Sequence, residues 1–155
     1  MKPVEIRAPR SDELRALAHL KIEWARIDPR PDGAAVWKYA DDLGGWMDRM
    51  GDRLLCRVAV SGDALIGMVW LVVFERVPDF DDRKRRTGDV QSLYVVPSKR
   101  GRGVGRALLE AICAEADARG IPRVTTASTP SALPVYESAG FRTAATLLDR
   151  SASGA

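Results

Sequence analysis

Hydrophobic and polar residues in the first third of the chain follow two different periods. Residues 4–7 alternate one by one, which predicts a short strand. Apolar residues over 14–25 recur every three or four positions, which predicts an amphipathic helix. A second helical pattern follows over 34–50, and we expect Gly44 and Gly45 to interrupt it.

The rest of the chain predicts an alternation of strands and helices. Two extended apolar runs flank a short turn at Gly62, which is typical of an antiparallel hairpin. Gly120 and Pro122 are the expected stop signals of a long helix that precedes them. The predicted elements, in order, are strands over 54–60, 64–77 and 90–96, a helix over 103–119, a strand over 123–127, a helix over 131–139 and a last strand over 141–148.

This order, β-α-α-β-β-β-α-β-α-β, predicts a fold of the α/β class with one mixed sheet and helices on both faces. The sequence contains neither an internal repeat nor a linker rich in proline or glycine. We therefore expect a single domain over residues 1–150. Residues 151–155 are expected to form a flexible tail.

Composition narrows the classes of function. No run approaches the about 20 apolar residues of a membrane helix, and the first residues lack the apolar segment of a signal peptide, so we expect a cytoplasmic protein without membrane partners. The net charge of +3 is modest and argues against a nucleic-acid module. The basic run 83–86 follows three aspartates, which favours a solvated loop; the alternative is a rim that attracts an acidic acceptor or the phosphates of a cofactor. Cys56 and Cys113 lack the spacing of a metal site.

The strongest candidate for chemistry is the segment 100–105, Arg-Gly-Arg-Gly-Val-Gly, which joins a predicted strand to a predicted helix. Glycines allow positive φ angles and close approach of a ligand, and a helix N-terminus offers free N–H groups to a phosphate. The turn lacks the Lys-Ser/Thr ending of a Walker A loop. It also lies too late in the chain for a dinucleotide fingerprint. A diphosphate-bearing cofactor of another kind remains.

These residues and their surroundings resemble the GNAT superfamily of N-acetyltransferases. The family's coenzyme A loop, Gln/Arg-x-x-Gly-x-Gly/Ala, is matched by Arg100, Gly103 and Gly105. The run 93–97, Leu-Tyr-Val-Val-Pro, is similar to the family's central strand, and 136–141, Tyr-Glu-Ser-Ala-Gly-Phe, is similar to its Tyr-x-x-x-Gly-Phe motif. The close match spans about a third of the chain, residues 89–142.

The resemblance implies acetyl-CoA as the acyl donor and no metal. It places the pyrophosphate on the backbone of 101–105, with arginine side chains beside it, and the pantetheine arm along the central strand, where the Val95 N–H polarises the thioester carbonyl. The implied cofactor-binding residues are Leu93, Tyr94, Val95, Arg100, Gly101, Arg102, Gly103, Val104, Gly105 and Arg106.

The resemblance also suggests catalytic groups. Tyr136 stands where the family carries its general acid; the structural alternative is a tyrosine that packs on the sheet and moves no proton. Asp89 is the first candidate for the base, acting through a water, and its alternative role is to close a turn with Gly88. In a regular strand Gln91 would share the face of Asp89 and position that water. Glu75, or a water alone, is the next candidate.

The implied function is N-acetyl transfer from acetyl-CoA to a primary amine by direct attack in a ternary complex. The alternative is a non-catalytic acyl-CoA-binding module that acts as a sensor or regulator, since the asparagine that many members carry ahead of the motif tyrosine is missing here. We expect the two N-terminal helices to form one wall of the acceptor pocket. The acceptor stays open between small-molecule and peptide or protein amines, and the resemblance allows a homodimer.

Overall fold

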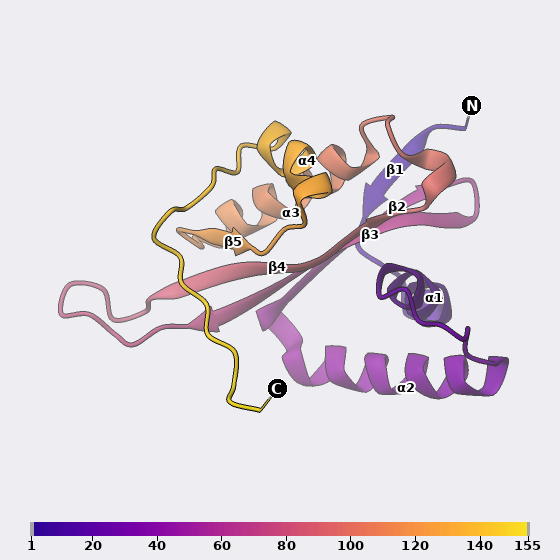
Figure 1. The fold of residues 1–155 in the computed structure, drawn as a ribbon, viewed down its shortest axis with the longest axis horizontal. Coiled ribbons are helices and arrows are strands. Elements are labelled where there is room, and N and C mark those ends of the chain that lie inside the picture. The colour runs from indigo at the N-terminus through magenta and orange to yellow at the C-terminus, as the bar shows by residue number, and fades with distance from the viewer. Residues whose placement is uncertain (1, 155) are drawn as a thin grey trace.

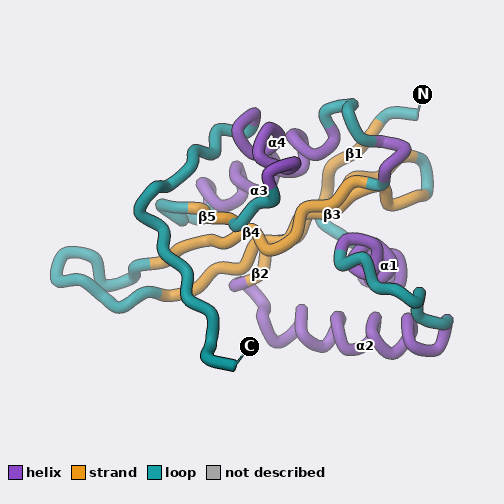
Figure 2. Tube along the Cα trace, in the orientation of Figure 1, coloured by secondary structure: helices purple, strands orange, loops and turns teal. Residues whose placement is uncertain are grey.

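The computed structural model describes residues 2–154, in which five strands form one twisted sheet in the order β1-β2-β3-β4-β5 (Figures 1 and 2). The first four strands are antiparallel neighbours, and the last pair is parallel. The strands are β1 (Val4–Arg7), β2 (Leu54–Ser61), β3 (Ala64–Glu75), β4 (Arg86–Val95) and β5 (Val124–Thr126).

Helices cover both faces of the sheet, as predicted. Figure 1 shows α1 and α2 on one side, and α3 and α4 on the other. Their bounds are α1 (Leu14–Trp24), α2 (Gly33–Met50), α3 (Val104–Ala118) and α4 (Leu133–Ser138), with 3₁₀ turns at Ser11–Glu13, Gly51–Arg53, Pro97–Lys99 and Pro130–Ala132. The mixed α/β fold class predicted from the sequence is confirmed. Within the described residues, no helix combines the length and hydropathy needed to cross a bilayer.

Because successive residues of a strand face opposite sides of the sheet, the apolar side chains form two cores. Successive residues of β3 show it: Met68 and Trp70 pack toward α1 and α2, whereas Val69 and Leu71 pack toward α3. On the α3 side, Leu108 belongs to the same fully buried cluster. Burying each such side chain contributes about 1.5–3 kcal/mol, so the sheet holds both helical layers in place.

The predicted break in the second helix is wrong, because α2 runs without interruption through Gly44 and Gly45. Gly44 instead allows close packing of the two N-terminal helices: a Cβ built there would lie 2.8 Å from Cδ1 of Leu14. The helical conformation is kept because tertiary contact offsets the low helix propensity of glycine, which costs about 1 kcal/mol.

The predicted last strand over 141–148 is also wrong. The segment after α4 forms no strand and runs past the ends of β3 and β4 in Figure 1. Residues 142–150 are exposed, Leu148 by 91%. The stretch Arg-Thr-Ala-Ala-Thr that opens it has no large apolar side chains, so little burial is available to offset the entropy of ordering a strand.

The loop between β3 and β4 extends far from the body of the molecule (Figure 2). Asp79 pairs with Arg85 at 3.1 Å, and Arg83 and Lys84 are exposed. Arg86 already belongs to β4, and its Nη2 donates to the Arg119 carbonyl at 2.8 Å. The basic run therefore lies in and beside a surface loop in which acidic neighbours balance part of its charge.

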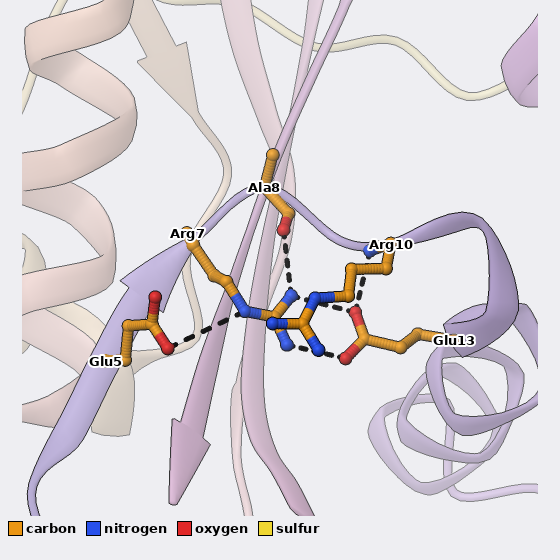
Figure 3. Close-up of polar contacts among 5 residues, drawn as sticks. All are labelled: Glu5, Arg7, Ala8, Arg10 and Glu13. Atoms are coloured by element: carbon orange, nitrogen blue, oxygen red, sulfur yellow. Dashed lines mark hydrogen bonds and ion pairs between the residues drawn. The ribbon is translucent and has the colours of Figure 1, made fainter. Parts of the chain in front are cut away.

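An ion pair fixes the passage from β1 into α1 (Figure 3). Nη2 of Arg7 lies 2.6 Å from Oε1 of Glu13, and Oε2 of Glu13 accepts from the Arg10 N–H at 2.7 Å. The hydrogen bond from Arg7, with that from the Arg10 backbone, lowers the pKa of Glu13 to about 2 although burial opposes it. This carboxylate therefore holds the start of α1 against the end of β1.

Candidate active site

The two parallel strands of the sheet separate beside the candidate site. β4 pairs with β5 only where Gly88, Asp89 and Val90 face 124–126. Thr126 Oγ1 donates to the Val90 carbonyl at 3.0 Å at the point where the strands part. β4 continues to Val95 along β3 alone. Within the described residues, the second half of β4, residues 91–95, thus presents an edge that no strand covers.

The orientation of backbone groups along this edge follows from two hydrogen bonds. The Val96 N–H donates to the Ile66 carbonyl of β3 at 2.9 Å. Because successive residues of a strand direct their N–H groups to opposite edges, the Val95 N–H faces the uncovered side. Nε of Arg100 donates to the Val95 carbonyl at 2.8 Å on that same side. The N–H that the sequence predicted for the thioester carbonyl is thus directed into the gap.

The glycine turn lies directly after this edge. Gly101 and Gly103 have φ angles of 70° and 78°, a conformation that glycine adopts without cost. Nothing lies within 4 Å of a Cβ built on either residue, so the positive φ angle and not crowding calls for glycine here. The first helical bond of α3 runs from the Ala107 N–H to the Gly103 carbonyl at 2.9 Å. The preceding N–H groups stand at the positive end of the helix dipole.

Gly105, the third glycine of the turn, allows close packing of its neighbours. A Cβ on Gly105 would lie 3.2 Å from Cγ2 of Val135 in α4 and 3.8 Å from Cγ2 of Val95. The start of α3, the end of β4 and α4 therefore meet at this residue. The glycine turn, the uncovered edge and the helix that carries Tyr136 form one continuous region.

The three predicted arginines differ in their surroundings. The guanidinium of Arg100 lies over the ring of Tyr94, 5.4 Å from its centroid, besides its bond to the Val95 carbonyl. Nε of Arg106 lies 2.6 Å from Oε1 of Glu110. Arg102 is exposed beside the turn. Positive side chains thus surround the N-terminus of α3.

Tyr136 is buried between α4 and the sheet, with 6% of its surface exposed. Its ring meets that of Phe141 edge-on, with centroids 5.4 Å apart. Burial raises the pKa of the Tyr136 phenol; a hydrogen bond with the Thr126 side chain opposes this shift, and the charge of Asp89 adds to it. The phenol is therefore protonated at neutral pH.

Asp89 is half-buried in β4, where Thr125 Oγ1 donates to its Oδ1 at 2.8 Å. Its side chain lies on the sheet face that carries α1 and α2, since its neighbour Val90 packs in the cluster under α3. The structure thus gives Asp89 a side-chain partner on β5, at the point where the two strands separate. The charge of Asp89 also acts on the Tyr136 phenol.

A β-bulge changes the expected pattern beyond Asp89. Trp70 faces Ser92 and Leu71 faces Val90, which leaves Gln91 as an extra, exposed residue of β4. The regular-strand argument that placed Gln91 with Asp89 therefore fails. Instead Ser92, three residues after Asp89, lies on the face of α1.

The alternative base Glu75 lies away from the gap. It ends β3, is exposed and faces Arg86, the first residue of β4, whereas the uncovered edge lies at the other end of β4, beyond Val90. His19 is half-buried on α1. Cys56 is buried, which raises the pKa of its thiol to about 12. Among residues 2–154, no cluster of three or more His, Cys, Asp or Glu side chains is placed to hold a metal ion.

Sequence reasoning missed three polar residues of this site, Lys21, Ser92 and Glu23. Nζ of Lys21 on α1 donates to Oγ of the buried Ser92 at 2.7 Å. Nearby, the Tyr94 hydroxyl donates to Oε2 of Glu23 at 3.0 Å. One signal was present in the sequence: Lys21 falls four residues after Leu17, within the apolar stripe of its helix, where a lysine is unexpected.

Known proteins resemble the chain in sequence and fold. A glucosamine 6-phosphate N-acetyltransferase of Trypanosoma brucei brucei is 37% identical over 65 residues, which are 42% of this chain and 44% of that relative, so the match spans less than half of its length. A GCN5-related N-acetyltransferase of Ralstonia eutropha JMP134 has a solved structure with 26% identity and a TM-score of 0.74, covering 98% of this chain and 100% of that one.

Two further solved structures share the fold at lower identity. The glucosamine-6-phosphate N-acetyltransferase of Arabidopsis thaliana has a TM-score of 0.77 at 14% identity, over 97% of this chain and 99% of that one. A predicted acetyltransferase of Clostridium acetobutylicum, solved with acetyl-CoA, has a TM-score of 0.74 at 18% identity, over 96% of both chains. The model of the acetyltransferase (GNAT) family matches residues 12–141. This match takes in most of the sequence, and the chain therefore belongs to the GNAT family of acetyltransferases.

Proposed function

We propose that the protein transfers an acetyl group from acetyl-CoA to a primary amine, which attacks the thioester directly in a ternary complex. The observation that carries the proposal is the continuity of the uncovered β4 edge with the glycine turn and the N-terminus of α3. A cofactor that carries an extended, amide-bearing arm next to a diphosphate fits this arrangement: the arm would lie along the β4 edge and the diphosphate at the glycine turn. Membership of the GNAT family supports the same donor.

In this proposal the pyrophosphate binds the backbone N–H groups of 101–105 and the first turn of α3, with Arg100, Arg102 and Arg106 beside it. The pantetheine arm lies along Leu93, Tyr94 and Val95 as an additional strand would. The Val95 N–H donates to the thioester carbonyl oxygen and stabilises the negative charge that develops there.

The chemistry then needs a proton donor for the leaving sulfur. The amine nitrogen bonds to the carbonyl carbon, the carbon–sulfur bond breaks, and Tyr136 gives its proton to the thiolate. An ordinary phenol has a pKa near 10 and a thiol near 8.5, so full transfer costs about 2 kcal/mol even before burial raises the phenol further. The nitrogen loses a proton once it has bonded to the carbonyl carbon, and this proton replaces the one that Tyr136 gave to the sulfur, so no phenolate accumulates.

The attacking amine must first lose a proton, because an alkyl ammonium with a pKa near 10.4 has no free electron pair. We assign this step to Asp89 acting through a water. The hydrogen bond from Thr125 leaves Oδ2 of the carboxylate for that water. The assignment also fixes the side of approach: the acceptor reaches the thioester from the face that carries α1 and α2.

The test is a thiol-release assay with acetyl-CoA and a panel of amines, run on the native protein and on Tyr136→Phe. We expect kcat to fall by about 10²-fold or more, the usual contribution of a general acid. Calorimetry serves as the control and should give a nearly unchanged Kd for coenzyme A. If no amine is acetylated by the native protein while acetyl-CoA still binds tightly, a non-catalytic acyl-CoA sensor replaces the enzyme.

A further inference from the structure

Lys21 occupies an unusual position for a lysine. It projects from α1 toward the sheet, and its Nζ contacts Ser92 Oγ at 2.7 Å on the face that also bears Asp89. The Ser92 side chain is buried. From Asp89 to Ser92 the strand advances at most about 10 Å, at about 3.3 Å per residue, so both residues are within reach of one small molecule.

The positive charge of this lysine is not neutralised by a carboxylate of the described chain. Burial lowers the pKa of the Lys21 ammonium, and no acidic group offsets that shift. The nearest acid along the helix, Glu23, is bonded to the Tyr94 hydroxyl and to Arg30 instead. A half-buried cation without a counter-ion costs free energy unless a ligand supplies one.

The geometry also leaves a donor for such a ligand. An ammonium has three N–H donors. One meets Ser92, and the Trp24 ring, whose centroid lies 4.2 Å from Nζ, takes a second side of the group. Lys21 borders a cavity of about 440 Å³ that runs between the end of α1 and the start of α2 and is lined mainly by apolar side chains. There is room beside the ammonium for part of a substrate.

From these contacts we propose that Lys21, oriented by Ser92 and Trp24, binds an anionic group of the acceptor, so that the preferred substrates are amines that carry a carboxylate or a phosphate. The inference rests on the proposed acetyl transfer and narrows its acceptor. The amine faces the uncovered β4 edge, and the anionic group lies against α1. Lys21 determines specificity and takes no part in bond making.

Two pairs of probes, each differing in one anionic group, test the inference. Glucosamine 6-phosphate is compared with glucosamine, and L-phenylalanine with L-phenylalaninamide, by kcat/KM in the thiol-release assay. The variants are Lys21→Met, Lys21→Arg and the matched control Lys38→Met, whose exposed side chain on α2 pairs with Asp42. Thermal unfolding of each variant checks the fold.

We expect one pair to show a preference for its anionic member that falls by about 10- to 100-fold in Lys21→Met, through KM more than kcat. Lys21→Arg should keep most of the preference, and Lys38→Met all of it. The pair that shows this change identifies the anionic group of the acceptor as a phosphate or a carboxylate. Each ratio of kcat/KM values is compared between the native protein and a variant, so differences in basicity between the two amines of a pair cancel. An unchanged ratio in Lys21→Met, or no preference in either pair, overturns the proposal.

Calorimetry in the presence of coenzyme A separates this inference from the proposed function. If no probe is acetylated, but an anionic probe binds the native protein and not Lys21→Met, acetyl transfer is refuted and the anion site is retained. If neutral amines are acetylated while neither anionic probe binds better than its neutral partner, acetyl transfer is retained and the anion site is refuted. The anion site is also refuted if neither anionic probe binds or reacts.

Discussion

Glu13 illustrates how single residues of this chain respond to pH. Its folded pKa of about 2 lies below its ordinary value of 4.5, so the folded state binds the proton more weakly than the unfolded state. The stability that it contributes is therefore fully present above about pH 4.5 and is lost as pH falls toward 2. We expect Glu13→Gln to lower Tm by a few degrees at pH 7 and hardly at all near pH 2.

Thermal denaturation at both pH values measures this. Glu5→Gln is the control, because Glu5 is exposed and its carboxylate lies 3.8 Å from Nε of Arg7. It should change Tm less than Glu13→Gln at pH 7. A Tm difference for Glu13→Gln that is the same at both pH values would show that the carboxylate gains nothing from its ionised partners.

At the same scale, local sequence predicted some features of the candidate site and not others. The turn at Gly101 and Gly103, with its positive φ angles, could be predicted because a turn is built from neighbouring residues, whose conformations depend on their own side chains. The contact of Lys21 with Ser92 joins residues 71 positions apart and depends on how α1 packs on the sheet. Its local signal, a lysine within an apolar stripe, indicates an unusual environment but names no partner.

The glycine turn and α3 form the element on which donor binding is proposed to depend. Gly103→Asp introduces a like charge beside the pyrophosphate and a side chain at a φ of 78°, and we expect it to abolish coenzyme A binding in calorimetry. Gly120→Asp is the matched control, since Gly120 has a φ of 68° and open space around it at the opposite end of α3. Equal losses in both variants would attribute the effect to backbone strain alone.

The helices and strands that could be predicted are those determined by the hydrophobic pattern of their own segment. All four helices and five of the six expected strands are present, because amphipathic periods and turn residues are local. The continuity of α2 through Gly44 depends on Leu14, and a strand after Gly140 would depend on a partner edge. Neither condition can be read from the segment itself.

For the molecule as a whole, the end of the chain contributes little to the packed structure. Beyond Thr146 the described residues are exposed, and the Leu147 N–H donates to the nearby Ala144 carbonyl at 3.2 Å. Removing residues 147–155 should therefore shift Tm by no more than about 2 °C, since surface changes have small effects.

Differential scanning calorimetry of the truncated chain checks this, with coenzyme A affinity as a second measurement. We expect both to stay close to those of the full chain. A large loss of Tm would mean that residues 147–155 contribute packing energy to the folded state, which their exposure does not indicate.

The extra residue at Gln91 has a practical consequence for anyone who mutates this protein. Counting alternate positions from Asp89 along β4 would direct a mutagenesis library to Leu93, whose side chain packs in the cluster under α3. The same count would omit Ser92, which faces the other helical layer. Because one inserted residue reverses the parity of the strand, libraries meant to alter acceptor choice should use odd positions before the insertion and even positions after it.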